Sequence, residues 1–154
     1  MQIKKYKVND STVAEIGRFT ILWNLFERDF CSNNCNPNKI KEVASEIIFN
    51  DGAVKEFANV LNKRRGWFEQ NVLEYIETEL YPIGANSGTK NDNKMMQQFM
   101  EQNDEYKNCG CLLVINRIRN NLLHGLKCIS DLDRQIELFK ATNKVLESIS
   151  RKEV

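Results

Sequence analysis

Apolar residues recur at steps of three and four along nearly the whole chain, and this spacing constrains the fold more than any other feature. In residues 12–30 the apolar positions are Ile16, Phe19, Leu22, Trp23, Phe26 and Phe30. Similar patterns run through 39–50, 53–65, 67–80, 94–103, 105–124 and 130–149. Such spacing places apolar side chains on one face of a helix, and no segment alternates with the period of a strand. The sequence predicts an all-α protein, a bundle of four long helices with one or two short extra helices.

Local signals predict where these helices begin and end. Thr12 and Glu15 have the spacing of a capping box, and Ser130 and Asp133 have the same spacing before the last helix. Pro82 forbids continuation of the helix that precedes it. The polar stretch 82–93 shows no periodicity, so we expect a loop, either functional or disordered, with disorder the favoured alternative.

Composition limits the classes of function that are open to the chain. Its 154 residues suffice for one domain with a real core, so residues 1–154 are interpreted as a single domain. The formal net charge is +1, which marks neither a nucleic-acid coat nor a membrane-surface protein. The longest apolar run, 111–115, is far shorter than a bilayer span, and no signal-peptide segment is evident. These features predict a soluble cytoplasmic protein without membrane contact.

The cysteines are Cys31, Cys35, Cys109, Cys111 and Cys128. An odd number without the spacing of a disulfide framework suits a reducing compartment. The spacing of Cys31 and Cys35 falls within the range of zinc ligands, whereas that of Cys109 and Cys111 does not. Ordinary free thiols are therefore predicted, and neither a metal nor another cofactor is expected.

The segment RNNLLHG, residues 119–125, ends the helix predicted over 105–124 and contains the only histidine, His124. On a helical wheel the core stripe comprises Cys111, Val114, Ile115, Ile118 and Leu122. On the other side Asn116, Asn120 and His124 follow at steps of four, flanked by Arg117 and Arg119. Beside this polar sector lie three leucines, Leu112, Leu113 and Leu123. We therefore expect this face to meet a second copy of the chain across a twofold axis, giving a homodimer.

A purely structural interpretation of His124 is an alternative. A histidine followed by glycine is a common helix end, with Gly125 in a left-handed turn and the imidazole near the negative end of the helix dipole. What favours a functional role is the whole string, in which Arg119, Asn120, three spacers, His124 and Gly125 end a buried helix.

Arg119, Asn120 and His124 resemble the signature of the HEPN superfamily, the higher-eukaryote and prokaryote nucleotide-binding domains. That signature is an arginine, often followed by asparagine, with a short spacer before a histidine. The aromatic segment 18–30 is also similar to the first helix of prokaryotic members. The resemblance implies a HEPN-like four-helix bundle, commonly dimeric, in which two motifs form a metal-independent endoribonuclease site. It further implies a toxin or antiphage defence effector.

The residue types suit this chemistry. RNA cleavage without a metal needs a base for the 2′-OH, an acid for the departing 5′-oxygen, and positive charge near the phosphorus. One chain has one histidine, so a dimer would supply His124 once as base and once as acid. Arg119 would bind phosphate oxygens, and Asn120 would orient the imidazole or bind the phosphate. The alternative is a catalytically silent binding module, either an antitoxin or a partner of a nucleotidyltransferase.

Other residues are candidate RNA contacts. Asn116 and Arg117 lie beside the motif on the same helix. In KRRGW, residues 63–67, phosphates could be bound by Lys63, Arg64 and Arg65 while Trp67 stacks on a base. The favoured alternative is that these cations complement a helix end before Gly66 and that Trp67 lies in the core. Glu27 and Asp29 are accessory candidates, for which a solvated helix face is the favoured alternative.

Overall fold

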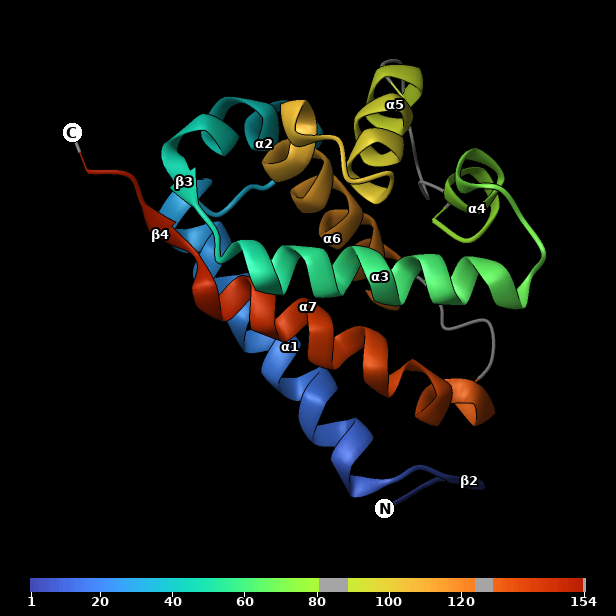
Figure 1. Ribbon diagram of the computed structural model, residues 1–154. Helices are drawn as coiled ribbons and strands as arrows, with labels where there is room; N and C mark the ends of the chain where they lie inside the picture. The colour runs from blue at the N-terminus through green and yellow to red at the C-terminus, as the bar shows by residue number, and fades with distance from the viewer. Residues whose placement is uncertain (81–88, 124–128, 154) are drawn as a thin grey trace.

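The computed structural model describes residues 1–80, 89–123 and 129–153, and these residues are mostly helical (Figure 1). The α-helices are α1 Asp10–Phe30, α2 Pro37–Val43, α3 Asp51–Trp67, α4 Val72–Thr78, α5 Thr89–Met100, α6 Lys107–Leu123 and α7 Ile136–Ser148. Three 3₁₀ segments are η1 Ala44–Glu46, η2 Asp104–Tyr106 and η3 Ile129–Gln135. The predicted all-α class is confirmed, while a specifically HEPN-like bundle stays a prediction. No helix in these ranges is both long enough and apolar enough to cross a bilayer.

Two small antiparallel strand pairs correct the prediction that the chain lacks strands. β1 Gln2–Ile3 pairs with β2 Tyr6–Lys7 next to the N-terminus. β3 Ile47–Ile48 pairs with β4 Ser150–Arg151, so that Ile47 lies opposite Arg151. Strands of two residues are too short to produce an alternating pattern, and β3 depends on a segment from the far end of the chain.

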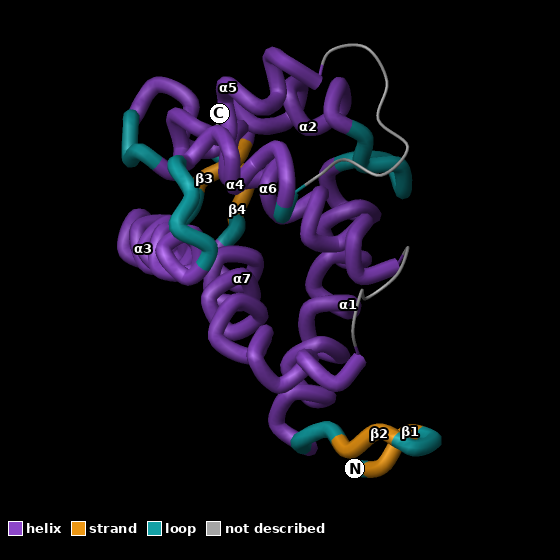
Figure 2. Tube along the Cα trace, turned by 90° about the vertical axis from the view of Figure 1, so that its right-hand side faces the viewer, coloured by secondary structure: helices purple, strands orange, loops and turns teal. Residues whose placement is uncertain are grey.

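The helices form two groups around α6 (Figures 1 and 2). α5 and α2 pack against α6, and α7 packs against both α1 and α3. Every residue from Gly110 to Ile118 is buried. A helix that is buried on all sides needs apolar residues all round, which explains the unbroken apolar run at 111–115.

The central place of α6 corrects the helical-wheel interpretation of its polar side. Leu112 and Leu113 are buried in the core, and the side chain of Leu123 lies outside the described residues. The wheel assumed a helix with one face on the outside, whereas neighbouring elements surround this part of α6. The buried leucines therefore provide no reason to expect a protein contact, and the predicted homodimer must rest on other grounds.

Gly110 permits the close approach of α5 and α6. A Cβ atom at this position would lie 2.3 Å from the carbonyl oxygen of Met95 and 2.7 Å from Cβ of Phe99. Real Cβ contacts are longer than this, so any side chain here would push the two helices apart. The position of α6 in the fold depends on this glycine.

Neither predicted capping box is formed as expected. α1 begins at Asp10 with Asn9 as its N-cap, and Thr12 is buried in the first turn. The Thr12 hydroxyl donates to Asp133 Oδ1 at 2.7 Å, and the backbone N–H of Asn9 donates to the same oxygen at 2.9 Å. Asp133 lies in η3, and α7 begins only at Ile136. Asp133 thus holds the start of α1 instead of capping the last helix.

Several element boundaries also differ from the prediction. The helix expected over 39–50 ends at Val43, because the chain then turns through η1 into β3. The helix expected over 67–80 is reduced to α4. In the predicted loop 82–93, residues 89–93 belong to α5, and 81–88 lie outside the described residues. The helices expected over 53–65 and 105–124 correspond closely to α3 and α6.

Cys31 and Cys35 form a disulfide, with their Cα atoms 5.2 Å apart. The prediction of free thiols was wrong for this pair, because the turn after α1 brings the two residues together. Their sulfur atoms are bonded to each other, so they are no longer candidate zinc ligands, and cysteine usage no longer argues for a reducing compartment. Cys109 and Cys111 are free thiols, and Cys128 lies outside the described residues.

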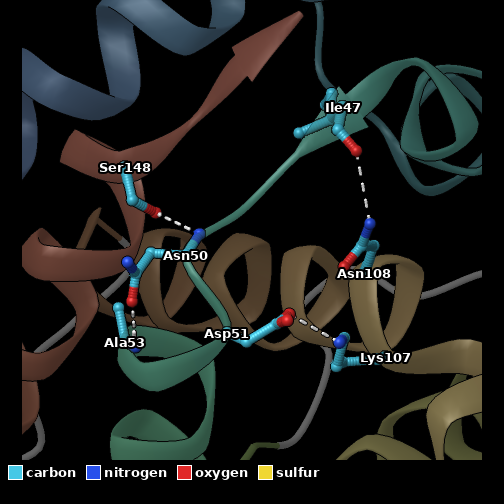
Figure 3. A network of polar contacts seen from close by, with 7 residues as sticks. All are labelled: Ile47, Asn50, Asp51, Ala53, Lys107, Asn108 and Ser148. Atoms are coloured by element: carbon cyan, nitrogen blue, oxygen red, sulfur yellow. Dashed lines mark hydrogen bonds and ion pairs between the residues drawn. The ribbon is translucent and has the colours of Figure 1, made fainter. Parts of the chain in front are cut away.

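A polar network ties the beginning of α6 to the connection between β3 and α3 (Figure 3). Lys107 Nζ lies 2.7 Å from Asp51 Oδ1, and Asn108 Nδ2 donates to the carbonyl of Ile47 at 3.3 Å. Asn50 caps α3, because its side-chain oxygen accepts a hydrogen bond of 2.9 Å from the backbone N–H of Ala53. The network fixes the N-terminal end of α6 against the connection between β3 and α3.

Candidate functional site

Arg119 and Asn120 lie near the last described turn of α6 and contact each other. Nη1 of Arg119 donates a hydrogen bond of 3.1 Å to Oδ1 of Asn120. Both side chains are half-buried. α6 extends to Leu123, and His124 and Gly125 lie outside the described residues, so the imidazole has no described contacts. Two of the three predicted catalytic residues are therefore placed together.

The first helix contributes a carboxylate to this pair. Oε1 of Glu27 lies 3.6 Å from Nη2 of Arg119, with side-chain exposures of 15% for Glu27 and 33% for Arg119. Trp23 and Phe26 are buried on the same helix, and their packing holds Glu27 near α6. Partial burial strengthens such an ion pair relative to one in open water. The structure thus brings Glu27 to the motif, although a solvated position was the favoured expectation.

Asp29 differs from Glu27 although both are carboxylates on α1. Its Oδ1 pairs with Nε of Arg28 at 2.9 Å, and both side chains are more than half exposed. Asp29 therefore lies on the solvated face that the sequence favoured for both residues. The two side chains point to different faces of α1 because they are two positions apart, and only Glu27 pairs with the motif.

Arg117, a candidate RNA contact, is only 6% exposed. Its Nη1 donates to the carbonyl of Leu80 at 3.2 Å and to Oδ1 of Asn93 at 2.7 Å. Burial lowers the pKa of Arg117 to about 10, although Asp92 acts in the opposite direction, so the guanidinium is still charged at neutral pH. These contacts give Arg117 a structural role that joins α6 to α5 and to the end of α4.

Asn116, the other candidate beside the motif, is 4% exposed. Within the described part of the chain, its Oδ1 atom has no hydrogen-bond donor. A buried acceptor without a donor costs free energy, so its presence needs an explanation. Asn116 lies one turn before Asn120, so this unpaired acceptor borders the motif.

The residues around Arg117 were missed by sequence reasoning. Asp92 Oδ1 lies 2.6 Å from Nζ of Lys41, which belongs to α2. Asp92 and Asn93 are buried in α5, but their surrounding sequence is polar and was predicted to be a loop. No local signal identifies them, because each is buried only by a partner from a distant segment.

The cations of KRRGW lie on another element, at the C-terminal end of α3. Arg64 donates to Oε1 of Gln135 at 2.6 Å, and Nε of Arg65 donates to Oδ1 of Asn62 at 3.1 Å. Lys63 is exposed. α3 runs through Gly66 to Trp67, and Trp67 is 48% exposed. The favoured alternative, which placed Trp67 in the core, was therefore wrong.

A surface cavity of about 390 Å³ opens beside the beginning of α6. Residues that line it include Lys41, Tyr106, Lys107, Cys109 and Lys152. Lys41 and Lys107 are paired with carboxylates, as described above, and burial raises the pKa of the Cys109 thiol. A thiol with a raised pKa is a poor nucleophile at neutral pH. The cavity therefore offers less chemistry than the motif end of α6.

Comparison of the chain with protein-family models, with curated proteins and with solved structures gave no match in any of the three.

Proposed function

We propose that the protein is a metal-independent endoribonuclease that cleaves single-stranded RNA, with Arg119, Asn120 and His124 as its catalytic residues. The observation that carries the proposal is the half-buried cluster of Arg119, Asn120 and Glu27 directly before the only histidine of the chain. An arginine held by two neighbours presents its planar guanidinium in a fixed orientation, as recognition of a phosphate requires.

The proposed reaction is an attack of the 2′-OH on the adjacent phosphorus. One His124 imidazole takes the proton of the 2′-OH as the new bond from the 2′-oxygen to phosphorus forms. The bond from phosphorus to the 5′-oxygen breaks, and a second imidazolium donates a proton to that oxygen. Arg119 stabilises the extra negative charge on the phosphoryl oxygens. The products are a 2′,3′-cyclic phosphate and a 5′-hydroxyl.

Two imidazoles require two copies of the chain, because each copy has a single histidine. We therefore include a homodimer in which the motif ends of two α6 helices face each other. This inference rests on the histidine count and on the HEPN resemblance, since Leu112 and Leu113 no longer support it. In its cellular role the protein would be a toxin or an antiphage defence effector.

Glu27 serves as a positioning residue in this scheme. Its carboxylate faces one arm of the Arg119 guanidinium while Asn120 accepts from the other arm. This leaves the remaining N–H groups of Arg119 for phosphate. Loss of Glu27 would free the guanidinium to rotate, so a bound phosphate would be held less well.

The decisive experiment incubates the purified protein with single-stranded RNA in EDTA and analyses the product ends. We expect 2′,3′-cyclic phosphate and 5′-hydroxyl ends, and we expect DNA to resist cleavage because it lacks the 2′-OH. Products with 3′-hydroxyl ends, or cleavage that requires a divalent metal, would overturn the mechanism. Absence of cleavage on any RNA would favour the silent binding module.

Variants assign the roles. His124→Ala should reduce cleavage well beyond the roughly hundredfold expected for one proton-transfer group, because base and acid are lost together. Arg119→Lys should be severely impaired, since an ammonium does not reproduce the bidentate fork. Glu27→Gln should be weaker than wild type, whereas the matched change Asp29→Asn on the same helix should have no effect. Equal losses in these last two variants would remove Glu27 from the site.

Mixing experiments test the composite site directly. If both histidines of a dimer are required, activity in randomly exchanged mixtures of wild type and His124→Ala should follow the square of the wild-type fraction. A linear dependence would show that each copy works alone. Sedimentation at micromolar concentration should show a species twice the 18.0 kDa mass of one chain.

A further inference from the structure

The C-terminal end of α3 exposes an aromatic surface that the proposed catalytic cluster does not use. Trp67 and the next residue, Phe68, are 48% and 46% exposed. Large aromatic side chains are usually buried when nothing binds them. Two neighbouring exposed rings therefore require an explanation beyond the packing of the core.

Two arginines lie near the Trp67 ring, Arg64 from the same helix and Arg134 from η3. Cζ of Arg64 lies 5.2 Å from the ring centroid, and Cζ of Arg134 lies 5.9 Å from it. Arg64 is held in place by Gln135 and by the carbonyl of Arg134, at 2.6 Å and 3.3 Å. The segment η3 thus places Arg134 next to α3. These contacts hold Arg64 near the Trp67 ring without a ligand. We call Trp67, Arg64 and Arg134 the Trp67 platform.

Cations outnumber carboxylates in the two segments that form this platform, residues 63–70 and 131–135. Residues 63–70 contain three cations and one carboxylate, Glu69. In η3, Arg134 adds a further cation, Asp131 is an exposed carboxylate, and Asp133 is bonded to the start of α1. The last carbonyls of α3 already accept bonds from backbone N–H groups of residues 68–70. Backbone groups, and not the cations, therefore satisfy these carbonyls.

We infer that the Trp67 platform binds single-stranded RNA, with a base stacked on Trp67 and phosphate oxygens bound by Arg134 and Lys63. Flat aromatic faces combined with cations suit a ligand that alternates planar bases with negative phosphates. A duplex would not fit this chemistry, because its bases are already stacked on each other. The inference deepens and rests on the proposed function, since it adds a place where the substrate strand is held away from the motif of α6.

The two tryptophans of the chain allow a direct test by fluorescence. Trp23 is buried in the core, at 1% exposure, so Trp67 is the only tryptophan on which a base can stack. Titration of the His124→Ala protein with an unlabelled single-stranded RNA of roughly 10 nucleotides should quench part of the tryptophan emission. Trp67→Phe should abolish this quenching while most of the binding is retained. Binding without any quenching in the parent protein would overturn the inference.

Fluorescence anisotropy with a labelled RNA of the same sequence measures the affinities. In the His124→Ala background, Trp67→Ala should weaken binding roughly 5- to 150-fold. Arg134→Ala should also weaken it and should lower the slope of log affinity against log salt by about 0.7. The matched control is Arg151→Ala, because Arg151 belongs to β4, which lies near the opposite end of α3 (Figure 1), and its Cζ lies 4.6 Å from the centroid of the Phe30 ring. Equal losses from Arg134→Ala and Arg151→Ala would overturn the inference.

Two further outcomes separate the possible explanations. If Trp67→Ala weakened the binding of heparin as much as that of RNA, the platform would recognise negative charge alone, as in docking of an acidic protein, and the inference would fail. If RNA binding depended on Trp67 but no RNA were cleaved, the platform would stand and the proposed ribonuclease activity would fail. If RNA were cleaved but Trp67→Ala had no effect on RNA binding, the proposed ribonuclease activity would be supported and the inference about the Trp67 platform would fail.

Discussion

Asn93 Oδ1 accepts a hydrogen bond of 2.7 Å from Nη1 of Arg117, and this bond joins α5 to the centre of α6. The same guanidinium nitrogen also donates to the carbonyl of Leu80 after α4. One buried cation therefore holds three parts of the chain around the helix that carries the motif. Such pairing offsets the cost of burying the charged guanidinium.

Removal of Arg117 should destabilise the protein more than removal of Arg119. Arg117→Ala leaves a buried carbonyl and amide without a donor and creates a cavity, so the free energy of unfolding should fall by about 2–4 kcal/mol. Arg119→Ala removes a partly exposed pair and should cost about 1 kcal/mol or less. Urea denaturation measures both. Equal and small effects would contradict the structural role of Arg117.

Two of the helical glycines, Gly110 and Gly17, should respond to alanine in opposite directions. At Gly110 the added Cβ would collide with Met95 and Phe99, so Gly110→Ala should destabilise the fold by at least about 1–3 kcal/mol. At Gly17 the added Cβ would meet nothing within 4 Å, so Gly17→Ala should stabilise α1 by roughly 0.5–1 kcal/mol. Thermal melts of the two variants check the signs, and a neutral Gly110→Ala would exclude the close packing of α5 on α6.

Asp133 should contribute to stability through α1, not through α7. Asp133→Ala removes the acceptor of Thr12 and Asn9, so we expect a loss of about 1–2 kcal/mol in the free energy of unfolding. The exposed neighbour Asp131 is the matched control, and Asp131→Ala should change stability by less than about 0.5 kcal/mol. Hydrogen exchange should locate the loss at the first turn of α1. Faster exchange confined to α7 would contradict this assignment.

The cysteines should differ in their reaction with iodoacetamide. Only the thiolate reacts, and burial raises the pKa of the Cys109 thiol above its ordinary value. At pH 8 the native protein should therefore react more slowly at Cys109 than the unfolded chain does, and the rate should rise as the pH is increased. Burial also raises the pKa of Cys111, which should react only after unfolding.

Peptide-resolved mass spectrometry measures each of these cysteines separately. Cys31 and Cys35 should be labelled only after reduction, because their sulfur atoms are bonded to each other. Labelling of this pair in the unfolded, unreduced protein would show that the disulfide is absent. Rapid labelling of Cys109 in the native protein at pH 8 would show that its thiol is not shielded.

Helical structure was predictable from the sequence because helix formation is governed by spacing within a short stretch. The three- and four-residue steps identified α1, α3, α6 and α7, and they placed the Arg119 and Asn120 motif at the end of a helix. These patterns need no information about distant segments. Boundaries were less predictable, because α2 ends where β3 pairs with a strand from the far end of the chain.

Only the tertiary structure decided which polar residues are buried and which partners they have. Thr12 and Asp133 are 121 positions apart, so their bond could not be recognised in a local capping pattern. Leu112 and Leu113 are in the core because other elements surround α6, whereas a helical wheel describes one helix alone. Glu27 meets Arg119 for the same reason. Periodicity shows which face of a helix is apolar, but burial and pairing depend on what the folded chain places against each face.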